Sequence, residues 1–340
     1  MRKKQCILLV ILMLLITGCS NKLPDKYELG IIDTTEYGNR SLITYFDSDW
    51  NKVGETKHRY SNMSYCGFTN SCIQEGVLYL SPRGDSKKLD CGKIVALDLS
   101  TGDKKEYDFD RTNIIDFHVD DTGIYVVSNL NNISYLDKYD KNQNKIQTVE
   151  VPIDILDNVI TVKGKVYSIA TSMDTDSYDL YSFDMNKLSY TKVCNLDISE
   201  SPGFCEVYQE SIYFAVDTVL YVYNTEDNSL QEITLPHSNA FNLYRKDNIL
   251  YVGYTDIHNS GTSYIGSVNL DSMKMEDVLI YDGSILQMEM DKNNRWFIMD
   301  YETISQYKCN SAGEWEVTNT MKLEPKSNYY SGGFFLKNAN

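Results

Sequence analysis

The stretch Val77-Leu78-Tyr79-Leu80 returns in varied form five more times along the chain. The other copies are Gly123-Ile124-Tyr125-Val126, Lys165-Val166-Tyr167-Ser168, Ser211-Ile212-Tyr213-Phe214, Ile249-Leu250-Tyr251-Val252 and Arg295-Trp296-Phe297-Ile298. The third residue of each copy is aromatic, and these aromatic residues follow one another at intervals of 38 to 46 residues. A repeat of about 40–50 residues without helical patterning is typical of β-propeller blades, which have four strands each.

The segments between these copies alternate apolar and polar residues and are bounded by Gly, Asn, Asp and Ser, which predicts strands joined in hairpins. The segment before each copy, such as Ile114 to Val119, is predicted to be an innermost strand. A seventh blade, starting near Leu29, lacks its innermost strand, whereas Tyr329 to Lys337 form a strand without a blade. Because ring closure protects strand edges, we expect this C-terminal strand to complete the N-terminal blade. The sequence therefore predicts an all-β, seven-bladed β-propeller of four-stranded antiparallel blades, in one domain over residues 27–340 and with almost no helix.

The N-terminal residues have the features of an export signal. Arg2, Lys3 and Lys4 precede the apolar run Ile7 to Ile16, which is too short to span a bilayer and has the length of a signal-peptide core. Together with Gly18-Cys19, this segment resembles the lipobox of bacterial prolipoproteins. The alternative is an ordinary secretory signal with an incidental cysteine.

The lipobox resemblance implies cleavage after Gly18 and a lipid on the Cys19 sulfur. Residues 1–18 are then a lipoprotein signal peptide and residues 19–26 a short lipidated tether. A diacylated cysteine gives stable membrane anchoring. We therefore expect the domain at the extracytoplasmic face of the cell membrane, with the membrane itself as a partner through the lipid anchor.

The charge of the chain argues against one class of partner. The full sequence has a formal net charge of −16, and loss of the three basic residues among the first eighteen takes it to −19. Nucleic-acid binding depends on Lys and Arg that neutralise phosphates. We therefore expect no nucleic-acid partner, whereas cationic partners or metal ions are compatible with the charge.

Six cysteines lie beyond Cys19: Cys66, Cys72, Cys91, Cys194, Cys205 and Cys309. Export permits disulfides, but sequence cannot choose among the 15 pairings that six cysteines allow. Cys66–Cys72 and Cys194–Cys205 are nearest in sequence. Buried free thiols on strands are an equal alternative.

Two stretches carry a resemblance to known propeller repeats. Ala96-Leu97-Asp98-Leu99-Ser100-Thr101-Gly102 resembles the core of the quinoprotein-type (PQQ-like) repeat, although Glu106 stands where that family usually has tryptophan. Asp291-Lys292-Asn293-Asn294-Arg295-Trp296 resembles the entry of NHL-like and lactonase-like blades, with Asn294 where glycine is usual. Both motifs serve turns and blade packing and imply no cofactor, because propellers host many unrelated functions.

The sequence contains no recognisable catalytic motif, so no catalytic residue and no cofactor are predicted. Asp47-Ser48-Asp49-Trp50-Asn51 begins like a calcium loop but lacks the required glycine and glutamate, and we interpret it as a polar turn. Asp174, Asp176 and Asp179 could gather a cation, but a solvated loop is the simpler interpretation.

One set of residues is a candidate ligand site in the central channel. Asp116 and His118 are two residues apart on a predicted innermost strand and so share a face. Glu206 and Glu289 lie on other predicted innermost strands and could meet them. By resemblance to lactonase-like propellers, such channel carboxylates could hold a divalent cation. The simpler alternative is that His118 is a hydrogen-bonded packing residue.

The predicted links between the second and third strands of a blade differ in length. The long ones are Thr34 to Arg40, Pro82 to Gly92, Thr171 to Tyr178 and Thr255 to Ser263, whereas the fifth blade has only Asp217-Thr218. Long loops on a rigid scaffold are where binding commonly occurs. We therefore expect any protein or small-molecule ligand on this face.

Three functions remain open from the sequence. The leading hypothesis is a membrane-anchored binding or scaffolding lipoprotein without catalytic activity. The alternative is a propeller enzyme of lactonase or lyase type that uses a divalent cation in the central channel. By analogy with quinoprotein-like lipoproteins, a subunit of an envelope assembly machine is a third candidate.

Overall fold

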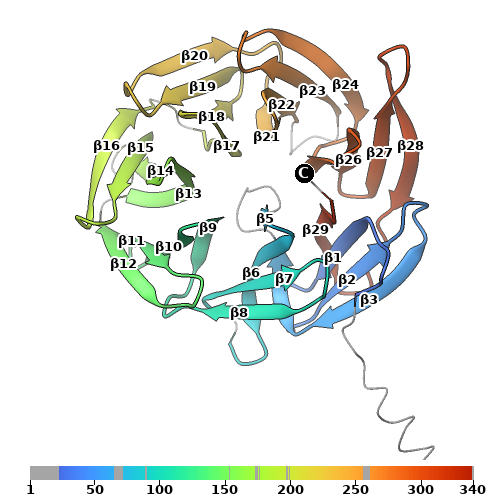
Figure 1. Ribbon diagram of the computed structural model, residues 1–340, viewed down its shortest axis with the longest axis horizontal. Coiled ribbons are helices and arrows are strands. Elements are labelled where there is room, and N and C mark those ends of the chain that lie inside the picture. The colour runs from blue at the N-terminus through green and yellow to red at the C-terminus, as the bar shows by residue number, and fades with distance from the viewer. Residues whose placement is uncertain are drawn as a thin grey trace, which may run out of the picture.

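The computed structural model describes residues 23–64, 72–88, 90–152, 154–172, 175, 177–196, 198, 200–255 and 261–338. Seven antiparallel blades stand in a ring around a central channel (Figure 1). The described residues form strands and turns but no helix, so they include no helix able to cross a membrane. The predicted all-β, seven-bladed propeller is therefore confirmed.

The strands of each blade follow one another from the channel to the rim. The first three blades contain β29 (Tyr330–Leu336), β1 (Leu29–Thr34), β2 (Ser41–Phe46) and β3 (Lys52–His58); β4 (Tyr60–Ser64) and β5 (Cys72–Gln74), β6 (Val77–Asp85), β7 (Lys93–Asp98) and β8 (Lys104–Asp108); and β9 (Ile114–Asp120), β10 (Gly123–Leu130), β11 (Ile133–Tyr139) and β12 (Lys145–Val151). The fourth and fifth contain β13 (Asp154–Val162), β14 (Lys165–Ser172), β15 (Tyr178–Asp184) and β16 (Ser189–Asn195); and β17 (Cys205–Tyr208), β18 (Ser211–Val216), β19 (Val219–Asn224) and β20 (Leu230–Thr234). The last two contain β21 (Ala240–Lys246), β22 (Ile249–Tyr254), β23 (Thr262–Asn269) and β24 (Met275–Asp282); and β25 (Gln287–Met290), β26 (Arg295–Met299), β27 (Thr303–Cys309) and β28 (Trp315–Lys322).

The C-terminal strand closes the ring as predicted. β29 pairs antiparallel with β1, with Leu336 opposite Leu29. Beside this pairing, the Arg295 guanidinium lies 2.8 Å from the Glu28 carboxylate and 2.6 Å from that of Asp291. The ladder thus places the C-terminal strand in the first blade, and the ion pair between Arg295 and Glu28 joins the last blade to the segment that enters β1.

The second blade departs from the expected strand pattern. Its inner position is shared by β4 and β5, which both pair with β6. Pro82 lies opposite Met63 in this pairing, and β6 continues to Asp85. The loop predicted to start at Pro82 is therefore shorter than expected, because pairing with β4 extends the strand.

Leu23 lies within the predicted tether of residues 19–26 but packs into the domain. Leu23 and Tyr27 are buried in the core between the first two blades. The Tyr27 hydroxyl donates a hydrogen bond to the Leu99 carbonyl at 2.7 Å. A Cβ on Gly54 would lie 2.5 Å from Pro24, which shows how closely this segment packs. The signal peptide and Cys19 lie outside the described residues.

Acidic and amide side chains build the turns between strands. The Asp140 carboxylate accepts hydrogen bonds from the backbone amides of Asn142 and Asn144 at 2.8 and 2.9 Å. Asp47 makes the same bonds to Asp49 and Asn51, so the calcium-like stretch is a polar turn, as predicted. Short polar side chains that bond the backbone two residues on stabilise such turns. Part of the high Asp content therefore serves the fold.

The stretches that resemble known repeats also act in turns and packing. Asp98 accepts hydrogen bonds from the amides of Ser100 and Thr101. Asn294 adopts a φ of 58°, which explains why asparagine can replace the usual glycine. Glu106, at the usual tryptophan position, lies 3.0 Å from the Lys93 ammonium. In this blade an ion pair occupies the place of aromatic packing.

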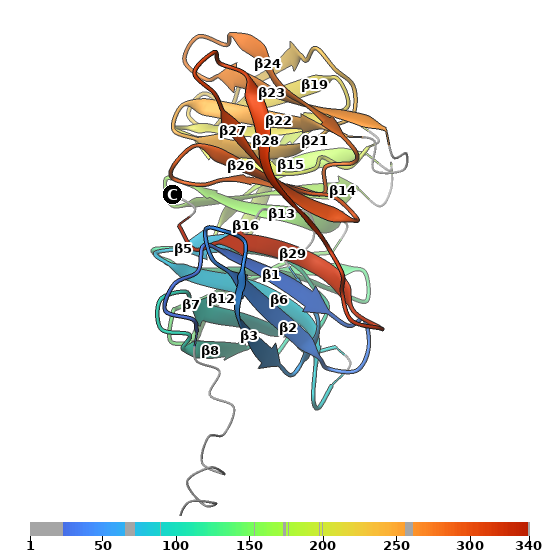
Figure 2. The same ribbon diagram turned by 90° about the vertical axis from the view of Figure 1, so that its right-hand side faces the viewer.

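The propeller has two distinct faces. Turns between the first and second strands of a blade lie on one face, which we call the inner-turn face; residues 121–122, 163–164, 209–210 and 247–248 form four of them. Links between second and third strands lie on the opposite, long-loop face; their described residues include 35–40, 86–88, 90–92, 177, 255 and 261. β29 ends and β1 begins on the inner-turn face, on which the C-terminal end lies in Figure 2. The expected two-residue link in the fifth blade is confirmed, since β18 ends at Val216 and β19 begins at Val219.

Candidate functional site

A cavity of about 260 Å³ lies in the central channel. Its walls come from the innermost strands of five consecutive blades, the second to the sixth. The lining residues are Cys72, Asp116, Phe117, His118, Asn158, Val159, Ile160, Thr161, Phe204, Cys205, Glu206, Val207 and Arg245. Because each blade contributes only one to four residues, this site exists only once the ring has closed.

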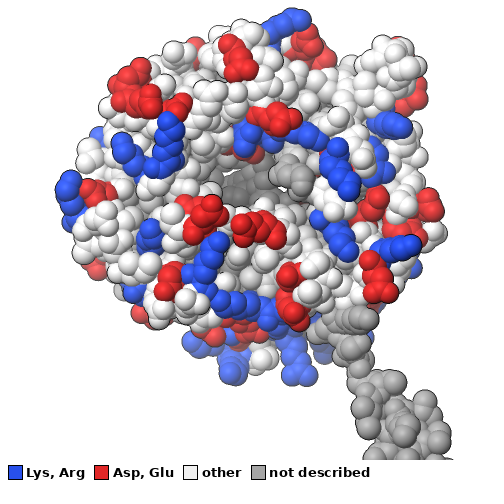
Figure 3. All heavy atoms as spheres, in the orientation of Figure 1, with Lys and Arg blue, Asp and Glu red and all other residues white. Residues whose placement is uncertain are grey.

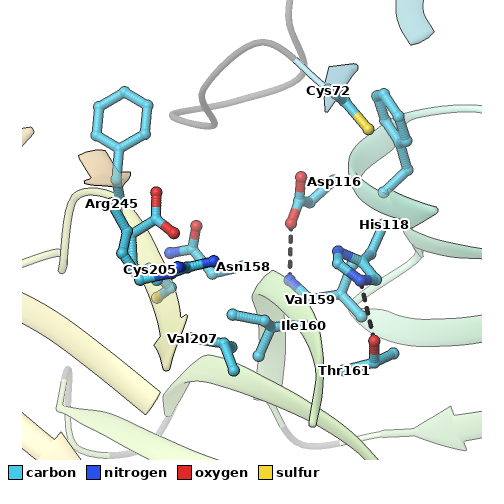
Figure 4. Close-up of a pocket in the computed structure, with 13 residues that line it drawn as sticks. Cys72, Asp116, His118, Asn158, Val159, Ile160, Thr161, Cys205, Val207 and Arg245 are labelled. Atoms are coloured by element: carbon cyan, nitrogen blue, oxygen red, sulfur yellow. Dashed lines mark hydrogen bonds between the residues drawn. The ribbon is translucent and has the colours of Figure 1, made fainter. Parts of the chain in front are cut away.

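Asp116, on β9, is the most unusual group in the cavity wall. It is 3% exposed, and its Oδ2 accepts a hydrogen bond from the Val159 amide at 2.7 Å (Figure 4). Its Oδ1 is buried without a hydrogen-bond partner. Burial raises the pKa of Asp116 to about 7, against the opposing effect of the Val159 and Phe117 backbone amides. A buried acceptor without a partner is costly, so Asp116 is a group that a ligand could satisfy.

A β-bulge in the next blade brings a second polar wall to Asp116. The register of β13 against β14 shifts between Leu156 and Val159, so that two residues stand outside the regular pairing. Asn158, in this bulge, lines the cavity, and burial raises the pKa of Asp157 beside it. Bulges commonly re-aim side chains at functional sites. Here the bulge also turns the Val159 amide toward Asp116.

His118 lies in the same cavity wall as Asp116, as the two-residue spacing predicts. Its Nε2 is 3.0 Å from the Thr161 hydroxyl. Burial lowers the pKa of His118, so the ring is neutral at neutral pH. A neutral imidazole bonded to a hydroxyl agrees with the packing alternative as well as with a role in hydrogen bonding to a ligand.

The opposite side of the cavity carries Glu206 and Arg245. Arg245 donates from Nη1 to the Asp247 carbonyl at 2.8 Å, while its Nε is buried without a hydrogen-bond partner. In Figure 4, Arg245 and Asp116 stand on opposite sides of the cavity, with Asn158 between them. The described lining residues thus include two carboxyl groups and one guanidinium.

Glu289 does not join the other three candidate residues in this cavity. It is 1% exposed on β25, and its Oε1 accepts a hydrogen bond from the Gln287 amide at 2.7 Å. Gln287 in turn donates to the Phe334 carbonyl at 2.8 Å. Glu289 therefore belongs to the contact between the last blade and β29, because β25 lies beyond the blades that line the cavity.

Two half-buried thiols in the lining, Cys72 and Cys205, were not among the predicted site residues. Burial raises the pKa of Cys72 to about 12 and also raises that of Cys205. Cys72, Cys91, Cys194, Cys205 and Cys309 are all free, and Cys66 lies outside the described residues. All five are therefore free thiols: Cys91 is buried, Cys72, Cys194 and Cys205 are half-buried, and Cys309 is exposed, so no Cys194–Cys205 bridge forms.

The described residues contain no group of three His, Cys, Asp or Glu side chains arranged to hold a metal ion. Of the loop carboxylates considered from sequence, Asp179 is buried and lies 2.5 Å from the Lys192 ammonium. Asp174 and Asp176 lie outside the described residues. The charge of Asp179 is thus balanced by a lysine.

The cavity lies toward the inner-turn face. His118 is opposite Tyr125, Thr161 opposite Val166 and Arg245 opposite Leu250, all within a few residues of the connecting turns. Figure 3 shows this face, with a hollow at its centre and carboxylates gathered at the edge of the hollow over β5 and β9. The placement of a ligand on the long-loop face stays a prediction, but this cavity is nearer the opposite face.

Comparisons with known proteins support the fold and nothing finer. No protein-family model and no curated protein matches the sequence. The structure is similar to a proposed 6-phosphogluconolactonase from Bacteroides fragilis NCTC 9343, with a TM-score of 0.62 and 11% identity over 92% of this chain and 98% of that one. A protein of the same description from Bacteroides uniformis ATCC 8492 gives a TM-score of 0.62 and 12% identity over 92% and 100% of the two chains. At this identity the similarity establishes a shared propeller scaffold, and function has to be argued from the site.

Proposed function

We propose that this protein is an extracytoplasmic binding module that holds a small ligand in its central channel. The observation that carries the proposal is the channel cavity, in which Asp116 Oδ1 and Arg245 Nε are both buried without partners. Unpartnered polar groups around a concave, largely apolar cavity are what a bound ligand satisfies.

The enzyme alternative comes from the two structurally similar proteins described as 6-phosphogluconolactonases. A phosphorylated sugar lactone carries negative charge, but the described cavity wall has two carboxyl groups, Asp116 and Glu206, against one guanidinium, Arg245. Placing a phosphate there would add repulsion without enough compensating cations. The charge of the wall therefore favours binding of another ligand class over this reaction.

Membrane anchoring through Cys19 is the second part of the proposal. It rests on the lipobox resemblance alone, with Leu23 to Glu28 leading into β1 on the inner-turn face. An anchor there would turn the inner-turn face toward the membrane and the long-loop face away from it. Cys19→Ala should release the protein from the membrane fraction; continued membrane association of this variant would refute the anchor.

Scaffolding remains a proposal for the long-loop face. Tyr37 and Tyr301 are exposed in links on this face, at 73% and 67%. Exposed aromatic side chains suit protein contacts. Pull-down of the lipidated protein with and without shortened 35–40 and 86–92 links would test this; partners that bind both forms equally would exclude these two links as their site.

The channel proposal is tested by filling the cavity. Val207→Phe adds a ring to the wall, and Val222→Phe, on the outer half of the same blade, is the matched control. Both variants and the native protein are screened against a metabolite pool by thermal shift and ligand-observed NMR, and the pool is analysed for turnover. Binding lost only in Val207→Phe supports a channel binding module, whereas catalytic turnover of a lactone would support the enzyme alternative.

A further inference from the structure

Asp116 and its surroundings define the chemistry of the ligand more closely than the cavity alone. Oδ2 is already bonded to the Val159 amide at 2.7 Å, so only Oδ1 lacks a donor. Among the other lining side chains that could donate, His118 Nε2 lies against Thr161 at 3.0 Å, Arg245 stands on the far side of the cavity, and Asn158, between them, makes no hydrogen bond to Asp116 Oδ1. A ligand that satisfies Asp116 must therefore bring its own hydrogen-bond donor.

The charges around the cavity add a second condition. Among the described lining residues, Asp116 and Glu206 carry carboxyl groups and Arg245 is the single cation. When Asp116 is ionised, the wall holds one more negative than positive charge. A ligand with one positive charge balances this wall, whereas an anion increases the imbalance.

The remaining wall limits the size and body of the ligand. Phe117, Val159, Ile160, Phe204 and Val207 supply apolar surface around the polar groups. A volume of about 260 Å³ is at the small end for ligand pockets. We infer, on the basis of the proposed function, that the channel binds a small organic ammonium ion. Its N–H group donates a hydrogen bond to Asp116 Oδ1, and its apolar body packs against these side chains.

This mode of binding is linked to the protonation of Asp116. The ammonium ion favours the ionised carboxylate. Because Asp116 has a pKa of about 7, it holds a proton at lower pH, and binding of the ammonium ion there must release that proton. The affinity of the channel for the ammonium ion should fall about tenfold for each pH unit below 7 and be constant above pH 7. The charged and titratable groups around Asp116 on the packed strands are Cys72, His118, Asp157, Cys205, Glu206 and Arg245.

Three probes of nearly equal shape separate charge from size: isobutylamine, isobutanol and isobutyrate. Their dissociation constants for the intact protein are measured by ligand-observed NMR at pH 8 and pH 6. We expect isobutylamine to bind at least tenfold more tightly than the other two at pH 8, and to lose about tenfold at pH 6.

Asp116→Asn is the decisive variant, since it removes the charge but keeps an acceptor for the Val159 amide. Asp140→Asn removes the same charge from an exposed turn and is the matched control. We expect only Asp116→Asn to abolish the preference for isobutylamine and its dependence on pH, while circular dichroism confirms that both variants fold.

The outcomes separate this inference from the proposed function. Equal binding of the three probes, or unchanged preference in Asp116→Asn, overturns the ammonium inference. If the metabolite screen then yields a channel ligand without a cationic nitrogen, the binding proposal stands and the ammonium inference is wrong. If neither the screen nor the probes detect binding that Val207→Phe removes, both are wrong.

Discussion

Replacing Asp116 by Asn should make the stability of the propeller less dependent on pH. In the native fold the buried carboxyl has a pKa of about 7, raised by burial from 3.8. At a pH between these two pKa values, Asp116 therefore holds a proton in the folded protein and releases it in the unfolded chain. The stabilising contribution of that proton is fully present below about pH 4 and is lost as pH rises through 7.

The size of the effect follows from the shift. About three pKa units at ~1.4 kcal/mol each correspond to a loss on the order of 4 kcal/mol between pH 4 and pH 8. Asn cannot ionise, so the variant avoids this loss, while its side-chain oxygen can still accept the Val159 amide hydrogen bond. Its NH₂ group, if left without an acceptor, costs about 1–3 kcal/mol at every pH.

Urea unfolding of both proteins at half-unit steps from pH 4.5 to pH 8.5 measures the difference. We expect Asp116→Asn to be less stable than, or equal to, the native protein at the acidic end and more stable by about 1–3 kcal/mol at pH 8. Asp140→Asn, with the same change in net charge at an exposed turn, should not show this gain. Parallel pH curves for the native protein and Asp116→Asn would refute the raised pKa and the reasoning built on it.

Three further predictions concern closure, packing and thiol reactivity. Arg295→Gln removes the guanidinium that contacts Glu28 at 2.8 Å and should lower the free energy of unfolding by about 2 kcal/mol; an unchanged urea midpoint would show that the β29–β1 ladder alone closes the ring. Gly123→Ala should destabilise by at least ~2 kcal/mol, because its Cβ would lie 2.2 Å from a backbone carbonyl oxygen of the facing strand, and a native melting temperature would contradict this packing. Cys72 should react with an alkylating agent much more slowly at pH 8 than the exposed Cys309, since desolvation raises the pKa of Cys72 to about 12; peptide mass spectrometry distinguishes them, and equal labelling rates would count against the raised pKa.

The candidate site shows which parts of a channel can be inferred from a sequence. The two-residue spacing placed Asp116 and His118 on one face of β9, because side chains of a strand alternate strictly between its faces. Glu206 was found for the same reason, as a residue of a predicted innermost strand. Arg245 and Cys205 lie on innermost strands as well, but a single arginine or cysteine on a strand does not by itself indicate a ligand site, so the sequence does not point to them.

Other features required the ring itself. Asn158 reaches the cavity because β13 contains a bulge, and the shift in register there changes which side chains face inward. Glu289 satisfies the strand pattern but lies on β25, outside the five blades that surround the cavity. Leu23 packs into the core although its neighbours in sequence read as a polar tether.

The sequence by itself determined the seven blades and the closure by the C-terminal strand. Both follow from a repeat of alternating strands, a pattern that each segment carries locally, and from one strand left without a partner. Only the tertiary structure decided which residues meet in the channel, which cysteines stay unpaired and which face the cavity approaches. These depend on register, bulges and the angular position of each blade, which bring together residues as distant as Cys72 and Arg245. No single segment of the chain contains that information.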